Sequence, residues 1–542
     1  MRGLIGWALT GVLFAGGLAE AQSRVSAPDN KHNLSVGATT AIRSTGMTEI
    51  CIVCHTPHSA APAAPLWNHT ASGAAYTSYA STTQDAPVGA PGGSSKLCLS
   101  CHDGTVALGG TLSMGTLAMQ GTASGGRLGG ASVIGPDLRS SHPISFVPVV
   151  SAGLVSPPAG SAVKLDASGQ VQCRTCHDPH TMDLDATTKK FLVMNNSASA
   201  LCLACHTTPW WSSTPASHRI STTSYAAAQG AHTGYATVAT NGCESCHRPH
   251  TAASPQRSLK AAEELTCGGT GTQCHSSTGI GRNLQAEFAK TYTHPTYSIT
   301  PSAHDASEAP GSLTFPMPET TNTAARHAEC PDCHNAHASA ATPATAPKGS
   351  GKLAGVWGID TAGVVVQPSG SPPSVKEYEI CFRCHAGSAN KPQVSGGPAP
   401  PYPNRVALQF DMRLLFDPAA ASFHPVAAVG RNASVPSLVA PWTTASQIYC
   451  SDCHDNDTGP KAAPTPGTGP AGTHGSNIKH LLAGRYDMDL GSSTESATVY
   501  ALCYKCHSRT SILANQSFPT HRMHIVDERS PCSLCPVSYT HL

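Results

Sequence analysis

Cysteine spacing constrains this chain more than any other feature of its sequence. All 22 cysteines fall into close pairs, and in nine of these pairs two residues separate the cysteines and a histidine follows at once. Two thiols at this spacing can add to the two vinyl groups of one haem, and the next residue then lies under the iron as its proximal ligand. The nine triplets are Cys51/Cys54/His55, Cys98/Cys101/His102, Cys173/Cys176/His177, Cys202/Cys205/His206, Cys243/Cys246/His247, Cys330/Cys333/His334, Cys381/Cys384/His385, Cys450/Cys453/His454 and Cys503/Cys506/His507.

Two further pairs depart from this spacing. Six residues lie between Cys267 and Cys274, and His275 follows, so we expect a haem here, with a disulfide that closes the Gly-Thr loop as the alternative. Cys532 and Cys535 are followed by proline. The sequence therefore predicts about ten covalently bound haem c groups, or eleven if Cys532 and Cys535 also hold one.

Zinc sites and thioredoxin-like redox pairs also use close cysteine pairs. Neither requires a histidine directly after the second cysteine, whereas ten of the eleven pairs have one. Disulfides are the usual expectation for an exported chain, but they do not explain the histidines either. No Cys-x-x-Cys-Lys motif is present, so the sequence gives no sign of a lysine-ligated catalytic haem.

The motifs alternate along the chain. We number them in order and name the odd-numbered ones leading motifs and the even-numbered ones trailing motifs. Four of the five leading motifs carry another histidine three residues after the proximal one, and the ninth has Asp457 there. Such a histidine is too close to reach the far face of its own haem, so we expect it to ligate a neighbouring haem. A solvent-facing loop histidine is the alternative. The four are His58, His180, His250 and His337.

The remaining histidines are expected to supply the other sixth ligands. His142, His294 and His424 each precede proline, which restricts them to an extended backbone and can point the imidazole outward. His69 and His304 are expected at the surface. About half of the pool between the motifs should be ligands. The distal candidates are His32, His58, His142, His180, His218, His232, His250, His294, His327, His337, His424, His474, His521 and His524.

The composition is unsuited to a conventional core. Aromatic residues make up 5% of the chain and charged residues 12%, beside 50 glycines and 43 prolines. Such a chain is either disordered or is packed around something else, and haem would supply that body. We expect a mostly irregular, haem-packed chain of tandem two-haem units, with few or no strands. Short helices should lie at the attachment motifs, for example around 261–265 and 498–507.

The chain begins like an exported protein. Arg2 precedes an apolar run from Leu4 to Leu18 and then Ala19-Glu20-Ala21, which predicts a signal peptide cleaved after Ala21, with an uncleaved anchor as the alternative. No later stretch is apolar for long enough to span a membrane. The net charge of +1 and the lack of a basic run do not indicate nucleic acid binding. We therefore expect a secreted protein in the periplasm or outside the cell.

The expected units follow the motif pairs and the Gly/Pro/Ser/Ala-rich stretches between them. Residues 536–542 resemble a translated sequencing adapter, so we expect the native chain to continue differently after Cys535. The expected divisions are a signal peptide at 1–21, two-haem units at 22–155, 156–232, 233–305, 306–435 and 436–530, and the start of a sixth unit at 531–542.

Several stretches resemble the doubled-CXXCH multihaem c-type cytochromes of metal-reducing bacteria. They are Glu49–His58, Pro65–Asn68, Lys96–Gly104, Tyr378–His385 and Ala501–His507. The resemblance implies bis-histidine low-spin haems and respiratory electron transfer to external acceptors. Asp457 and the wide motif at 267–274 depart from the family pattern.

With both axial positions filled by histidine, iron can change oxidation state but cannot bind substrate. We therefore expect an electron carrier and no catalytic residues. Its partners would be redox proteins, other multihaem cytochromes or further copies of the chain, as in a filament. The alternative is a multihaem reductase of the nitrite, hydroxylamine or sulfur-oxyanion type, which would need one iron with an open site.

Overall fold

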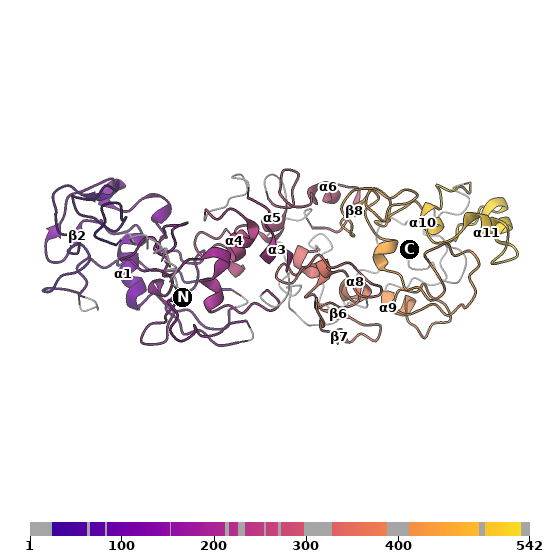
Figure 1. Cartoon of the computed structure of the whole chain (residues 1–542), viewed down its shortest axis with the longest axis horizontal. Coiled ribbons are helices and arrows are strands. Elements are labelled where there is room, and N and C mark those ends of the chain that lie inside the picture. Colours follow the sequence, from indigo (N-terminus) through magenta and orange to yellow (C-terminus); the bar gives the residue numbers. More distant parts are fainter. Residues whose placement is uncertain are drawn as a thin grey trace, which may run out of the picture.

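The computed structural model describes residues 24–61, 66–81, 84–151, 153–211, 216–225, 234–253, 256–268, 273–296, 328–386, 411–486 and 494–532. The expected signal peptide, the distal candidates His232 and His327, His304, Cys535 and the C-terminal tail lie outside these residues. The molecule is elongated, with β2 and α1 toward one end, α6 and β8 nearer the middle, and α11 at the other end (Figure 1).

The helices are short, as the sequence predicts, and six of the α-helices in the described segments include a motif cysteine. Only two, α1 and α8, exceed five residues among the described segments. The α-helices are α1 Gly93–His102, α2 Cys173–Cys176, α3 Ser217–Ile220, α4 Val238–Asn241, α5 Glu263–Cys267, α6 Gln285–Phe288, α7 Cys330–Cys333, α8 Glu377–His385, α9 Met412–Leu415, α10 Ala501–Tyr504 and α11 Arg509–Leu513. Shorter helical turns are η1 Ser124–Gly126, η2 Gly130–Ser132, η3 Ser197–Ser199, η4 Cys202–Ala204, η6 Gly242–Ser245, η7 Gln256–Ser258, η10 Gly351–Leu353, η11 Cys450–Asp452 and the π-helical η12 Met523–Asp527.

Strands are few, which confirms the expected fold class. The described residues form four antiparallel sheets of two strands each. The pairs are β1 Arg43–Ser44 with β4 Met119–Gln120, β2 Gly110–Thr111 with β3 Gly115–Thr116, β5 Tyr292–Thr293 with β8 Gly475–Ser476, and β6 Gly358–Ile359 with β7 Val365–Val366. Because β5 and β8 lie far apart in sequence, their pairing brings the loop before β8 beside α6 (Figure 1).

The motif sequences explain why three leading motifs form a tight turn. Thr175, Asp332 and Asp452 each precede the second cysteine of their motif. Each side chain accepts a hydrogen bond from the backbone N–H of the residue before the first cysteine, at 2.9, 2.7 and 2.8 Å. This satisfies an N–H that the first helical turn leaves without a partner.

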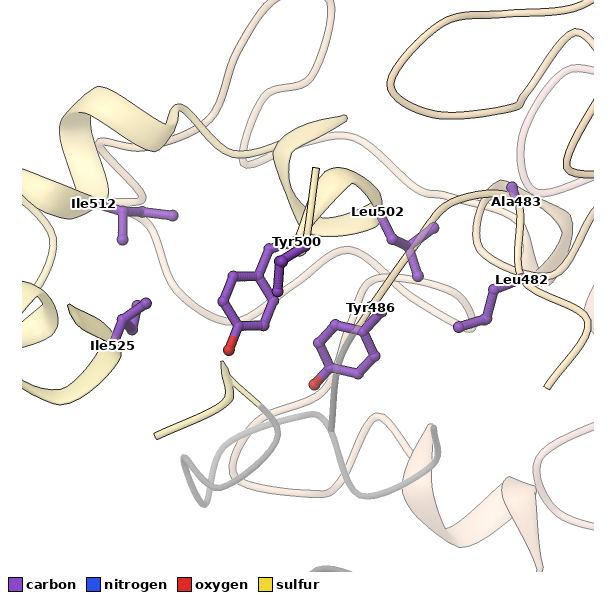
Figure 2. Packing of buried hydrophobic residues seen from close by; sticks show 8 residues of the cluster. Leu482, Ala483, Tyr486, Tyr500, Leu502, Ile512 and Ile525 are labelled. Atoms are coloured by element: carbon purple, nitrogen blue, oxygen red, sulfur yellow. The ribbon is translucent and has the colours of Figure 1, made fainter. Parts of the chain in front are cut away.

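Apolar side chains pack directly against attachment cysteines in the C-terminal part of the molecule. One cluster joins Tyr486, Tyr500 and Leu502 to Leu482, Ala483, Val499, Ile512 and Ile525 (Figure 2). Cys453 and Cys503 pack against it. A second cluster comprises Trp357, Ile359, Tyr378, Phe382, Ala386, Phe416 and Val426, with Cys450 at its edge. No helix in the described part of the chain is long and apolar enough to cross a membrane.

Candidate haem-binding sites

The standard motifs share one backbone hydrogen bond that places the histidine relative to the first cysteine. The histidine N–H donates to the carbonyl oxygen of that cysteine, four residues earlier, so the motif closes into a single turn with the imidazole beside the thiols. The bond is found at His55, His177, His206, His247, His334, His454 and His507, at 2.8 to 3.0 Å.

The wide motif keeps this bond across its longer spacer. The N–H of His275 donates to the carbonyl of Cys267 at 2.9 Å, although His275 lies eight positions after Cys267. Cys267 ends α5, as the first cysteines of other motifs lie in short helices. Cys267 and Cys274 are not joined by a disulfide. The spacer therefore loops out, and His275 makes the same backbone contact with its first cysteine as the standard motif histidines do.

Backbone carbonyls orient many of the motif imidazoles. A carbonyl oxygen can only accept a hydrogen bond, so Nδ1 must carry the hydrogen and Nε2 keeps its lone pair. This tautomer can bind iron through Nε2, and the hydrogen bond fixes the ring plane. The Nδ1–carbonyl pairs are His102–Ser132 (2.9 Å), His177–Lys190 (2.9 Å), His247–Arg257 (2.7 Å), His275–Arg282 (3.3 Å), His334–Lys352 (3.0 Å) and His454–His480 (2.9 Å).

Each of the first eight motif histidines faces one other imidazole at nearly the same distance. At leading motifs the partner lies downstream, after the next leading motif. These ring pairs, with centroid distances and interplanar angles, are His55–His180 (6.2 Å, 20°), His177–His250 (6.2 Å, 32°), His247–His337 (6.2 Å, 8°) and His334–His474 (6.1 Å, 17°).

At trailing motifs the partner lies upstream of the motif pair, and the rings are nearly perpendicular. These pairs are His102–His32 (6.1 Å, 69°), His206–His142 (6.2 Å, 82°), His275–His218 (6.4 Å, 88°) and His385–His294 (6.2 Å, 70°). The His-Pro residues 142 and 294 are both in this group. Several pairs join residues from different expected units, as His142 and His206 do.

The spacing of these rings fits a haem iron. A metal ion lies about 2 Å from an imidazole nitrogen, so two rings on opposite sides of one iron have centroids roughly 6 Å apart. All eight pairs fall within 6.1 to 6.4 Å. Rings stacked directly on each other would be closer, as His32 and Phe191 are at 4.2 Å. The residues present therefore suit an axial ligand pair at each site.

The surroundings favour the neutral form of several imidazoles in these pairs. Burial, reinforced by neighbouring imidazoles, lowers the pKa of His32, His206 and His337 to about 4. The same causes lower the pKa of His250 and His474 to about 3. Because a protonated ring cannot donate a lone pair to iron, low pKa values favour the ligand form at neutral pH.

The cysteines place consecutive motifs side by side. Interaction between the thiols of Cys98 and Cys173, together with burial, raises the pKa of Cys98 well above its ordinary value. The first cysteine of each later trailing motif interacts in the same way with the first cysteine of the next leading motif, in the pairs Cys202–Cys243, Cys267–Cys330, Cys381–Cys450 and Cys503–Cys532. Helices α1 and α2, and likewise α5 and α7, pack together at these junctions.

Within two units a basic side chain joins the leading motif to the trailing one. Arg383 donates to the carbonyl of Asp332 and stacks 4.2 Å from the ring of Trp357. Lys505 donates to the carbonyls of Asp452 and Lys461. Contacts within units thus alternate with contacts between units, and the attachment sites follow one another in motif order.

The second cysteine of the eighth motif, Cys384, lies near Cys333 of the seventh motif. The second cysteines of the first and second motifs, Cys54 and Cys101, are neighbours in the same way. Burial, followed by the charges of Asp332 and of the two cysteines of the eighth motif, raises the pKa of Cys333. Arg383 of α8 reaches the seventh motif as well, because it donates to the carbonyl of Asp332. Haem attachment at Cys384 stays a prediction.

Some candidate histidines are not brought into a ring pair. His58 is exposed, and among the described residues neither it nor His454 faces another imidazole. Burial lowers the pKa of His507 to about 4, with His424 and His521 as the neighbouring imidazoles. His524 directs Nδ1 at the carbonyl of Thr520, 2.9 Å away.

The expectation that His69 lies at the surface is wrong. Its side chain is 1% exposed. Nδ1 lies 3.0 Å from the carbonyl of Thr70, and Nε2 lies 3.6 Å from Sγ of Cys101. The segment after Trp67 is drawn inward by pairing of His69 with Thr111, which residue type alone does not signal.

Comparison with known families identifies the motif. Residues 167–209, which include the third and fourth attachment motifs, match the family described as the doubled CXXCH motif. No curated protein matches the chain. The chain thus carries the doubled motif of multihaem c-type cytochromes, and motifs of this kind hold covalently bound haem c.

Proposed function

We propose that this protein conducts electrons through a row of about ten bis-histidine haems, one at each motif followed by histidine. One observation carries the proposal. The first eight motif histidines, in order, each face a second imidazole at the spacing that suits one iron. Iron held in this way alternates between ferric and ferrous states and has no open position for a substrate.

The side chains of this protein would hold and tune the cofactors. The paired cysteines would attach each macrocycle, and the paired histidines would ligate the iron. Carbonyl groups such as those of Ser132 and Lys352 hold Nδ1–H and set the orientation of the ligand. Burial favours the neutral form of imidazoles such as those of His250 and His474. It also excludes water, and water access is one of the factors that set redox potential.

The proposed route follows motif order. Cysteine contacts join trailing motifs to the next leading motifs, and the basic side chains of Arg383 and Lys505 join the two motifs within their units. The elongated arrangement of the chain in Figure 1 supports one path from end to end. An eleventh site at Cys532 would extend it, because this thiol contacts Cys503 as the other junction cysteines contact each other.

We further propose that the protein works outside the cytoplasm, in respiratory electron transfer to metals or other external acceptors. Covalent haem attachment and the apolar N-terminal run support this location. The partners would be redox proteins, including other multihaem cytochromes or copies of this chain.

The test is a haem count combined with optical and electron paramagnetic resonance spectra of the purified holoprotein. We expect about ten haems per chain, all low-spin in both oxidation states. A chain without covalent haem would overturn the proposal. A haem that is high-spin in the wild-type protein and binds nitrite or hydroxylamine would replace it with the reductase alternative.

A further inference from the structure

The ninth motif breaks the rule that supplies partners to the leading sites. His180, His250 and His337 each follow a leading motif by three residues and face the histidine of the leading motif before. The equivalent residue after the ninth motif is Asp457. By this rule His334, in the seventh motif, should lack a partner.

Asp457 has another role in the structure. Its carboxylate lies 2.8 Å from Nζ of Lys290. Lys290 also pairs with Glu287 at 2.7 Å and donates to Oγ1 of Thr458 at 3.0 Å. The side chain that replaces the histidine is therefore held in an ion-pair network between α6 and the loop after the ninth motif.

His474 faces His334 instead. The ring centroids are 6.1 Å apart and the planes differ by 17°. The other three leading pairs have interplanar angles of 8 to 32°, whereas trailing pairs have 69 to 88°. The pair formed by His334 and His474 thus has the distance and the orientation of a leading site.

A hydrogen bond beside His474 also matches those at leading sites. At two of the other sites, the histidine that faces a trailing motif directs its Nδ1 at a backbone carbonyl. That carbonyl belongs to the residue just before the histidine that faces a leading motif. His32 lies 2.9 Å from the carbonyl of Pro179, before His180, and His218 lies 3.2 Å from that of Ala336, before His337. In the same way, Nδ1 of His294 lies 2.7 Å from the carbonyl oxygen of Thr473, the residue before His474.

The local backbone explains how a residue so far from the motif reaches this place. Asp455 Oδ1 accepts from the N–H of Gly472 at 2.8 Å, which ties the loop back to the ninth motif. Gly472 has a φ of +119°, and a Cβ there would lie 2.7 Å from Cε1 of His474. Just after His474, β8 pairs with β5. A glycine turn and a short sheet thus fix His474 in place.

We propose that His474 supplies the sixth iron ligand at the seventh motif, opposite His334, and replaces the histidine that the ninth motif lacks. This assignment rests on the proposed haem-carrying function. It predicts that a ligand lost at position 457 is restored from a loop seventeen residues later, with the leading-site geometry retained.

The test is His474→Ala in the full-length holoprotein, read by optical and electron paramagnetic resonance spectra. We expect one haem per chain to become high-spin and to bind carbon monoxide when reduced, with the haem count unchanged. Added imidazole should fill the vacated position and return that haem to low-spin.

Two further variants keep the result interpretable if His474→Ala folds poorly. His474→Met keeps a side chain that can ligate iron, so the haem of the seventh motif should stay low-spin. Its reduction potential should rise, since methionine ligation raises the reduction potential of haem iron. Asp457→Asn is the matched control at the position where the pattern expects histidine, and it should leave every haem low-spin.

The outcomes separate this assignment from the general function. If wild-type protein holds low-spin haems and His474→Ala leaves every haem low-spin and inert to carbon monoxide, His474 is not the ligand, although the electron-transfer proposal stands. A high-spin haem in Asp457→Asn would also contradict the assignment. Wild-type protein without covalent haem would contradict the proposed function itself.

Discussion

Leading and trailing sites use the same residue types but different geometry. The imidazole planes are near parallel in leading pairs, as at His247–His337 with 8°, and near perpendicular in trailing pairs, as at His275–His218 with 88°. The partner histidine lies downstream in the first class and upstream in the second. A single peptide couples them, since the carbonyl of Pro179 orients His32 of a trailing site and the next residue, His180, serves a leading site.

This difference indicates that the path of the backbone sets the angle between the two imidazole planes at each site. A histidine that approaches from a downstream loop and one that approaches from an upstream segment would meet the proposed iron from different backbone directions. Because the relative orientation of axial rings affects the electronic structure of low-spin iron, the two classes should differ in spectrum and potential even though all ligands are imidazoles.

The largest expected effect is seen in the spectrum of the wild-type holoprotein, because both classes of site contribute to it. Its oxidised electron paramagnetic resonance spectrum should contain two low-spin populations of similar size. The population with the larger principal g value belongs to perpendicular rings. Quantitative simulation of the spectrum checks this, and a single population would break the comparison.

Removing one complete site should have the next largest effect. Cys267→Ser/Cys274→Ser should lower the haem count by one per chain, take its signal from the perpendicular population and destabilise the fold by at least about 3 kcal/mol, because a covalently held cofactor is lost. Mass spectrometry and thermal unfolding measure this. The matched control is Cys202→Ser/Cys205→Ser, at a standard trailing motif. An unchanged haem mass in the first variant would show that the wide motif holds no haem.

Replacing one ligand in each class should sharpen the comparison. His250→Ala and His142→Ala should each make one haem high-spin, since each removes the ring that faces a motif histidine. We expect each to cost about 2 to 3 kcal/mol. The first should deplete the parallel population and the second the perpendicular one. If both variants lose low-spin signal from the same population, the two classes of site do not exist.

The smallest expected effect comes from one hydrogen bond. Ser437 Oγ lies 2.9 Å from Nδ1 of His507, so here the partner of the imidazole can be removed by mutation. Ser437→Ala should keep all haems low-spin and cost about 1 kcal/mol. A small shift in the potential of one haem, measured by spectroelectrochemistry, should accompany it because the ring loses its orienting partner. A high-spin signal in this variant would mean that Ser437 is essential for ligation.

Much of the fold class could be predicted from sequence because it follows from local patterns. Short helices at attachment motifs, such as α5 at Glu263–Cys267 and α10 at Ala501–Tyr504, need only the motif and its neighbours. The scarcity of strands follows from the high glycine and proline content.

The pairing of the imidazoles could not be predicted in the same way. The sequence identifies the repeated histidines after leading motifs, but His180 faces His55 across 125 residues, and only the packed structure gives that direction. His474 shows the same limit, because its place depends on a glycine turn and the pairing of β5 with β8. The surface position expected for His69 is wrong because its burial comes from a bridge to Thr111.

The direction of each partner along the chain would decide the order in which the sites close during the proposed export. Under the proposed ligation, a trailing site can close as soon as its own motif emerges, because its partner, such as His32 for His102, has already been delivered. A leading site must wait, since His55 needs His180 from the following pair. Completion then alternates along the chain, trailing before leading, and the newest leading iron stays one ligand short until more polypeptide arrives.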